Sequence, residues 1–353
     1  MKFVSYSLTQ IAVTVATAAL VVGYSLWLVP MKNHSIGDLA RIGWRANNYW
    51  GPKIPLVEFS NPLIEVGGYD KYYDVHILGD SFSIQPSRSW PNYVAAAGLS
   101  VRVQFLGKDM GTAITELMES PVFRTSPPKV LVYAPVERGL YWRFRVANGE
   151  CSSDRLPSPN VVLMPGRPLD PQPRELLQPN SDILSGEQLT YSRDFLVAQI
   201  LKLFKRSHEV YELPLTASRF SNVKADRVLV HVEDIDKAKW TASEIEHMRC
   251  ALRVFRDRVQ SNGRTLFVAM IVPDKLSIYH DDLVDTSLPS TVIPRLVDTD
   301  LLAPRLDVEL RAAVAAGQLD VYLPSDTHWG TAGVRIAGES FLMLLRNNRF
   351  LVN

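Results

Sequence analysis

The order of apolar and polar positions after residue 70 predicts buried strands that alternate with helices. The stretch 72–78 changes from alternating to wholly apolar and ends at Gly79-Asp80-Ser81, which predicts a buried strand followed by a turn. By the same reasoning we expect strands at 101–106, 129–134 and 266–272, and helices at 112–120, at 245–259 and from Gly330 to about Leu345. Because such alternation is typical of a parallel sheet covered on both faces, the sequence predicts an α/β fold.

The N-terminus contains a long uncharged stretch. No Asp, Glu, Lys or Arg occurs from Phe3 to Met31, and Ile11 to Val29 is almost wholly apolar. A helix of about 20 apolar residues crosses a bilayer core, whereas the apolar region of a cleaved signal peptide has about 7–15 residues. We therefore expect an uncleaved transmembrane anchor, held in a bacterial inner membrane through residues 8–29, with a cleaved signal peptide as the alternative.

The middle of the chain breaks the pattern. Leu156 to Pro179 carries seven prolines and shows no lasting period, which favours a long surface insertion, with a small separate lobe as the alternative. The expected organisation is a membrane anchor at 1–31, a linker that leads into the fold at 32–70, and a catalytic domain at 71–353 with an irregular insertion at about 145–225.

Composition excludes several classes of function. The chain has 38 Lys and Arg against 37 Asp and Glu, so its charge gives no reason to expect a nucleic-acid partner. Cys151 and Cys250, the two cysteines, are too few for a four-cysteine zinc site and allow at most one disulfide. His280-Asp281-Asp282 lacks a third spaced ligand, so we expect neither a metal nor another cofactor.

The strongest candidate for chemistry is Ser81. A side chain directly after a buried strand lies where an α/β sheet presents its ligands, at the carboxyl ends of the strands. A serine hydroxyl needs a base to remove its proton and an acid to orient that base. Asp326-Thr327-His328-Trp329, just before the last predicted helix, supplies both. Each segment alone is also typical of an ordinary helix start, with a serine or aspartate as the N-cap.

Four segments together resemble a known group of proteins: Gly79-Asp80-Ser81-Phe82-Ser83, Val136-Glu137-Arg138, Pro273-Asp274-Lys275-Leu276-Ser277-Ile278-Tyr279 and Asp326-Thr327-His328-Trp329. They resemble the SGNH (GDSL-type) hydrolase and acyltransferase superfamily, and within it the AlgX/AlgJ alginate O-acetyltransferase group. In the alginate proteins the last two segments precede the first two, so the motif order of this chain looks circularly permuted. The resemblance implies a three-layer SGNH-type fold with a central, mostly parallel sheet, here preceded by one transmembrane helix.

The resemblance also implies roles for residues. Ser81 would be the nucleophile, His328 the base and Asp326 the group that orients His328, with an acetyl-Ser81 intermediate. The expected oxyanion donors are the Ser81 backbone N–H and Gly107 or Gly111. The asparagine donor that is usual in the superfamily has no counterpart, because Val136-Glu137-Arg138 stands in its place.

Three further residues are candidate substrate contacts. Arg138 either binds substrate or forms an ion pair with a carboxylate, and the sequence leaves both readings open. Tyr141 and Trp142 are expected to stack on sugar rings, with an ordinary role in the core as the alternative.

The leading hypothesis is an extracytoplasmic O-acetyltransferase, anchored in the inner membrane with its catalytic domain in the periplasm. It would pass acetyl from Ser81 to hydroxyls of a secreted exopolysaccharide of alginate or cellulose type. By the resemblance, a multi-pass membrane acyltransferase of the MBOAT type would supply the acetyl group. The alternatives are a carbohydrate acetylesterase of the same fold and a non-catalytic scaffold of the secretion complex.

Overall fold

The computed structural model describes residues 2–28, 37–59, 61–107, 110–144, 158–169, 173–175, 190, 192–193, 195–197, 209–297 and 300–352. The strands are β1 (Val57–Phe59), β2 (Glu65–Val66), β3 (Val75–Gly79), β4 (Val101–Phe105), β5 (Val130–Ala134), β6 (Pro173–Glu175), β7 (Val210–Pro214), β8 (Arg227–His231) and β9 (Leu266–Ala269). The α-helices are α1 (Lys2–Leu28), α2 (Asp38–Ile42), α3 (Asn47–Trp50), α4 (Pro91–Ala96), α5 (Met110–Glu119), α6 (Pro121–Thr125), α7 (Leu140–Phe144), α9 (Val232–Asp236), α10 (Ala242–Gln260), α11 (Lys275–Tyr279), α12 (Ile293–Leu296), α13 (Leu306–Ala315) and α14 (Thr331–Asn347). Short 3-10 helices are η1 (Glu137–Gly139), η2 (Lys237–Lys239) and η3 (His280–Asp282).

The centre of the fold is a five-stranded sheet in the order β2-β4-β3-β5-β9, and every neighbouring pair in it is parallel. The four longer strands lie where the apolar runs predicted them, and the predicted α/β fold with a parallel sheet is confirmed. From β3 the chain goes to β4 on one side and then to β5 on the other, so the topological switch lies between β3 and β5. Gly79 pairs with Ala134 at the carboxyl end of this gap, where open α/β sheets bind ligands.

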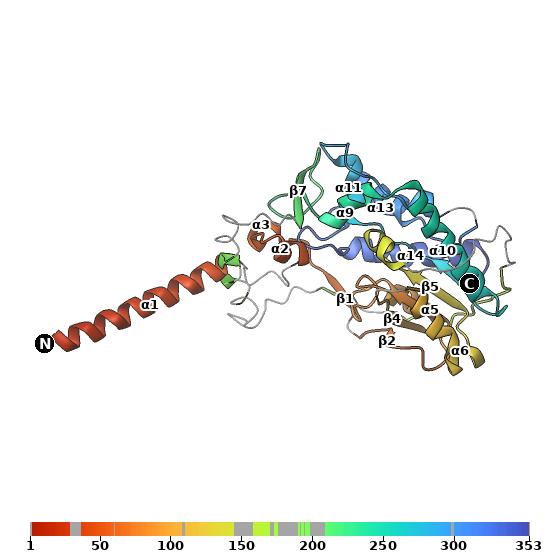
Figure 1. Ribbon diagram of the computed structural model, residues 1–353. Coiled ribbons are helices and arrows are strands. Elements are labelled where there is room, and N and C mark those ends of the chain that lie inside the picture. The colour runs from red at the N-terminus through yellow and green to blue at the C-terminus, as the bar shows by residue number, and fades with distance from the viewer. Residues whose placement is uncertain are drawn as a thin grey trace.

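Two apolar cores lie on opposite faces of the sheet, because alternate strand residues point to opposite sides. Val75, Ile77 and Val132 point to a core that helices α4, α13 and α14 complete, whereas Leu78 and Tyr133 point to one completed by α5, α6, α7, α10 and α12. Figure 1 shows helices on both sides of the strands. The arrangement is a three-layer sandwich.

Helix α1 is the long N-terminal helix that the uncharged stretch predicted, and it extends away from the body of the molecule (Figure 1). Among the described residues, no helix combines the length and the apolar character needed to cross a membrane. The transmembrane part of the prediction is therefore not confirmed.

The predicted insertion at about 145–225 lies largely outside the described residues. Of its described parts, β6 pairs antiparallel with β1, and β7 pairs antiparallel with β8. Cys250, on α10, is disulfide-bonded, while Cys151 lies outside the described residues.

Candidate active site

The turn that carries Ser81 begins at the end of β3. All five residues of β3 are buried, and a Cβ added at Gly79 would lie 2.5 Å from the side chain of Ser83. Glycine is therefore required for the tight approach of the turn to the strand. Immediately after it the chain turns, and Ser81 is left partly exposed at the carboxyl end of the sheet.

The side chain of Asp80 holds this turn in place. Its Oδ1 accepts a hydrogen bond from the Phe82 N–H at 3.1 Å, and its Oδ2 accepts one from the Val136 N–H at 2.6 Å. Asp80 is buried, so these bonds satisfy a carboxylate that would otherwise be costly to bury. The first motif is thereby tied to the second, which follows β5.

Ser81 and His328 are in direct contact. The Ser81 Oγ lies 2.7 Å from the His328 Nε2, and the His328 Nδ1 lies 2.6 Å from the Asp326 Oδ1. Because a carboxylate accepts only, the neutral imidazole carries its proton on Nδ1 and Nε2 is free to accept from the Ser81 hydroxyl. The structure thus joins the three predicted catalytic residues into one hydrogen-bonded chain.

The charges around His328 make it a stronger base than a free imidazole. Burial acts to lower the pKa of His328, but the hydrogen bond and charge of Asp326, followed by the charge of Asp38, outweigh it and raise that pKa above its ordinary value. Burial acts to raise the pKa of Asp326, and its hydrogen bonds with His328 outweigh this and hold it low. Asp326 therefore stays ionised and stabilises the imidazolium that forms when His328 accepts a proton.

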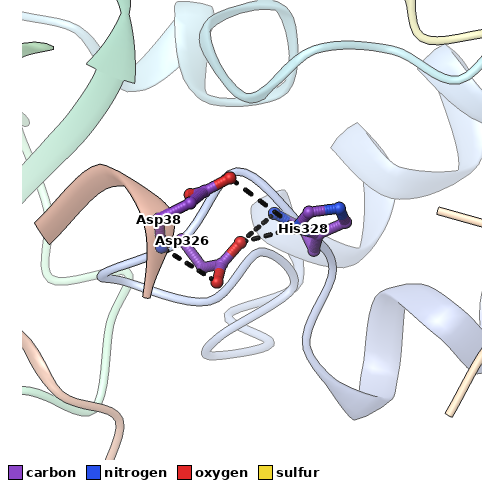
Figure 2. A group of neighbouring side chains, drawn as sticks. All are labelled: Asp38, Asp326 and His328. Atoms are coloured by element: carbon purple, nitrogen blue, oxygen red, sulfur yellow. Dashed lines mark hydrogen bonds and ion pairs between the residues drawn. The ribbon is translucent and has the colours of Figure 1, made fainter. Parts of the chain in front are cut away.

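Asp38, on α2, is a second carboxylate at this site (Figure 2). Its Oδ2 lies 3.8 Å from the His328 Nδ1, and its backbone N–H donates to the Asp326 Oδ2 at 3.2 Å. Asp38 could not be predicted from the sequence, since it belongs to no motif and lies far from His328 along the chain. Burial and the charge of Asp326 raise the pKa of Asp38.

Asp38, Asp326 and His328 also form the one group of metal-type ligands found among the described residues, with ligand atoms within 4.8 Å of one another. The His328 Nδ1 already bonds to the Asp326 Oδ1 at 2.6 Å, and the His328 Nε2 bonds to the Ser81 Oγ at 2.7 Å. The contacts that the structure shows are therefore those of a hydrogen-bonded acid and base.

Lys275 supports the loop that carries Asp326. It is fully buried, and its Nζ donates to three backbone carbonyls, those of Leu323 at 2.6 Å, Pro324 at 3.0 Å and Asp326 at 3.1 Å. This contact explains the lysine of the Pro-x-Lys segment as a support for the loop before α14. The segment was noted from sequence, but its task was not.

Glu137 and the residues around it form a buried ionic cluster behind the site. The Glu137 carboxylate accepts from the Ser277 Oγ at 2.7 Å and from the Val292 N–H at 2.6 Å. Lys237 is also buried and its Nζ lies 2.7 Å from the Asp274 Oδ2. The cluster joins the second motif to the third, because Glu137 of the second bonds to Ser277 of the third. Neither residue lines the cavity beside Ser81.

A small cavity of about 70 Å³ opens beside Ser81 and His328. Both apolar and polar side chains line it: Leu56, Val57, Phe59, Phe82, Tyr93, Leu323, Trp329 and Val334 are aliphatic or aromatic, and Gln85, Arg88 and Thr331 are polar. The Phe82 ring also packs against the His328 ring, with centroids 4.7 Å apart. A space of this size beside the nucleophile fits a short acyl group.

The other predicted site residues do not line this cavity. Gly107 is exposed and follows Leu106, whose N–H donates to the Gly79 carbonyl at 2.7 Å. Gly111 lies in the first turn of α5. Of the two alternatives for Arg138, the structure shows the ion pair, because its Nη1 lies 3.2 Å from the buried carboxylate of Asp234.

Tyr141 and Trp142 lie on α7 and pack against one another, with ring centroids 5.3 Å apart. Tyr141 also stacks on Trp240 at 6.4 Å, and Trp142 is 58% exposed. The described residues give neither of them a contact with the cavity, so a sugar-stacking role stays a prediction.

Comparison with known proteins agrees with this geometry. Residues 229–350 match a family model described as SGNH hydrolase-like domain, acetyltransferase AlgX. No curated protein and no solved structure matches the chain. The matched region includes Lys275, Asp326 and His328 but not Ser81. Across residues 229–350 the chain therefore carries an SGNH hydrolase-like domain of the AlgX type, a class of acyl-transfer and ester-cleaving enzymes.

Proposed function

We propose that this protein is an O-acetyltransferase that carries acetyl on Ser81 and passes it to a hydroxyl of a polysaccharide. The observation that carries the proposal is the continuous chain from the Ser81 Oγ to the His328 Nε2, at 2.7 Å, and from the His328 Nδ1 to Asp326, at 2.6 Å. Such a chain activates a serine for acyl transfer, and the matched family is described as an acetyltransferase.

The first half-reaction loads the enzyme. As the Ser81 Oγ attacks the carbonyl carbon of an acetyl ester, its proton passes to the His328 Nε2, and Asp326 stabilises the resulting imidazolium. The tetrahedral intermediate collapses, the bond to the donor oxygen breaks, and His328 returns the proton to that oxygen. The products are the donor alcohol and acetyl-Ser81.

The second half-reaction reverses these steps with a new alcohol. His328 removes the proton of a sugar hydroxyl, whose oxygen attacks acetyl-Ser81, and the proton then returns to the Ser81 Oγ. Water in place of the sugar gives acetate, so the same residues also support an esterase. The small volume of the cavity beside Ser81 favours a short acyl group and leaves little space for a long one.

We also propose a periplasmic location, with the polysaccharide and a membrane-bound acyltransferase of the MBOAT type as partners. Two observations support the location. The stretch from Phe3 to Met31 has no charged residue, and Cys250 is disulfide-bonded, whereas structural disulfides are rare in the bacterial cytosol. The membrane-bound donor follows from the location, because acetyl-CoA is not available outside the cytoplasm.

Incubation of the full-length protein with p-nitrophenyl acetate and oligosaccharides tests the proposal by mass spectrometry. Acetylated sugar is the expected product, and acetate alone would support the esterase. If neither product forms, the non-catalytic scaffold is supported. Ser81→Ala should abolish both products and the +42 Da acetyl adduct, which is about the mass of the group transferred in this mechanism. Ser287→Ala is the matched control, because Ser287 is exposed and lies in the loop that follows η3.

A further inference from the structure

The segment that leads into the fold, residues 37–42, is packed onto the loop that carries the base. Leu39 is fully buried in a small core with Trp50, Val210 and Leu229. The Ala40 N–H donates to the Ser325 carbonyl at 2.9 Å. These contacts fix the lead-in segment beside Asp326 and His328, although Asp38 and Asp326 are 288 positions apart in the sequence.

The approach of the two segments is close. A Cβ added at Gly37 would lie 2.2 Å from the Ser325 carbonyl oxygen, so only glycine fits there without moving the backbone. This close contact places Asp38, the next residue, directly against the Asp326-Thr327-His328 turn.

Asp38 forms hydrogen bonds with two residues of this turn, Thr327 and Asp326. Its Oδ1 accepts from the Thr327 N–H at 2.7 Å, and its Oδ2 accepts from the Thr327 Oγ1. Its own N–H donates to the Asp326 Oδ2 at 3.2 Å. The middle residue of the turn is thus bonded to Asp38 through backbone and side chain, while Asp326 is oriented by the Asp38 backbone.

The charge of Asp38 also faces the base. The charged groups that act on His328 are Asp326 at 2.6 Å, Asp38 at 3.8 Å and Arg138, which opposes the two carboxylates. Figure 2 shows the two carboxylates on the same side of the imidazole, around Nδ1. A carboxylate at this distance favours the protonated imidazole.

We propose that Asp38 is a second positioning carboxylate for His328, which fixes the Asp326-Thr327-His328 turn and helps to stabilise the protonated base. The role of His328 as base rests on the proposed function, whereas the coupling between Asp38 and His328 does not. The lead-in segment is then part of the catalytic apparatus and not a passive tether.

Asp38→Asn separates charge from shape. The amide oxygen can still accept from the Thr327 N–H, and the amide nitrogen can donate to the Thr327 Oγ1, so the turn stays bonded while the charge is lost. We expect the pKa of His328 to fall by about half to one unit. The rise of kcat/KM for p-nitrophenyl acetate with pH, below pH 7, should move to lower pH by the same amount. Asp285→Asn is the control, because Asp285 is exposed and its hydrogen-bond partner among the described residues is Ser287 of the same loop.

Asp38→Ala removes the hydrogen bonds as well. We expect kcat to fall about 10–100-fold, as misplacement of a catalytic group does, with a smaller change in KM. Thr327→Val tests the same contact from the other side, because it deletes the hydroxyl donor to Asp38 without changing any charge. It should lower kcat in the same direction and leave the pKa of His328 nearly unchanged.

The pKa of His328 is measured by NMR on histidine-labelled full-length protein, with the resonance assigned by its loss in His328→Gln. This readout needs no turnover, so it distinguishes the two proposals. Equal pKa values in the wild type and Asp38→Asn would overturn the role of Asp38 even in an active enzyme. A lowered pKa in a protein with no acetyl-ester activity would uphold the coupling and refute the proposed function.

Discussion

Replacing Lys275 by methionine tests how the structure holds the catalytic loop. Methionine has a similar length but no donor, so the carbonyls of Leu323, Pro324 and Asp326 would lose the hydrogen bonds that they now receive at 2.6, 3.0 and 3.1 Å. A buried carbonyl left without a partner costs about 1–3 kcal/mol. Part of this loss is offset, because the buried charge is also removed.

We expect a net loss of about 3 kcal/mol in the free energy of unfolding of Lys275→Met, because about 1–3 kcal/mol for each carbonyl left without a partner is partly offset by the removal of the buried charge. Urea denaturation of the full-length protein measures this loss. Because the released carbonyls belong to the loop of Asp326, kcat should also fall by about 100-fold. Lys239→Met is the matched control, since the side chain of Lys239 is 77% exposed and its partner in the described part of the chain is Asp236 of the same turn.

The pH dependence of stability gives a second check. Burial lowers the pKa of Lys275 to about 7, whereas an unfolded lysine titrates near pH 10.4. Between these values the unfolded chain binds the extra proton, so stability from this site rises with pH and is complete only above the unfolded pKa. The difference between the wild type and Lys275→Met should therefore grow from about pH 7 to about pH 10. An unfolding free energy equal to that of Lys239→Met, or a difference that stays constant over this window, refutes the reasoning.

Two further results are expected. The Cβ of Gly79→Ala would lie 2.5 Å from Ser83, so urea denaturation should show a loss of about 1–3 kcal/mol, whereas Gly68→Ala, with no atom within 4 Å of the added Cβ, should show almost none. Because His328 must be neutral to accept a proton and its pKa is raised, kcat/KM should rise with pH through a midpoint above about 6.5. Asp326→Asn should lower that midpoint, and a wild-type midpoint below 6.5 would contradict the assignment.

The sequence predicted most of the central sheet because its strands are short apolar runs bounded by turn residues. The predicted strands at 72–78, 101–106, 129–134 and 266–272 match β3, β4, β5 and β9 within a few residues. β2 was missed, because both of its residues are exposed and show no apolar pattern. Helix α13 and the β7–β8 hairpin were also not predicted.

The catalytic candidates came from local motifs, whereas the contacts that support them could not be predicted from those motifs. Ser81 ends a buried strand and His328 precedes a helix, so their sequence neighbours alone indicated turns at the right places. The sequence could not show that Arg138 faces Asp234, or that Gly107 lies away from the cavity. Those outcomes depend on how loops from different strands meet.

The sequence by itself determined which side chains can do acyl-transfer chemistry and which stretches form the sheet, because residue type and local periodicity are properties of neighbours along the chain. Only the tertiary structure decided that Asp38 would lie against the base and that Lys275 would hold the loop of Asp326. Both contacts join segments that are distant in sequence, and nothing in the local pattern of either segment encodes its partner. Their geometry depends on where the apolar cores place the end of each loop.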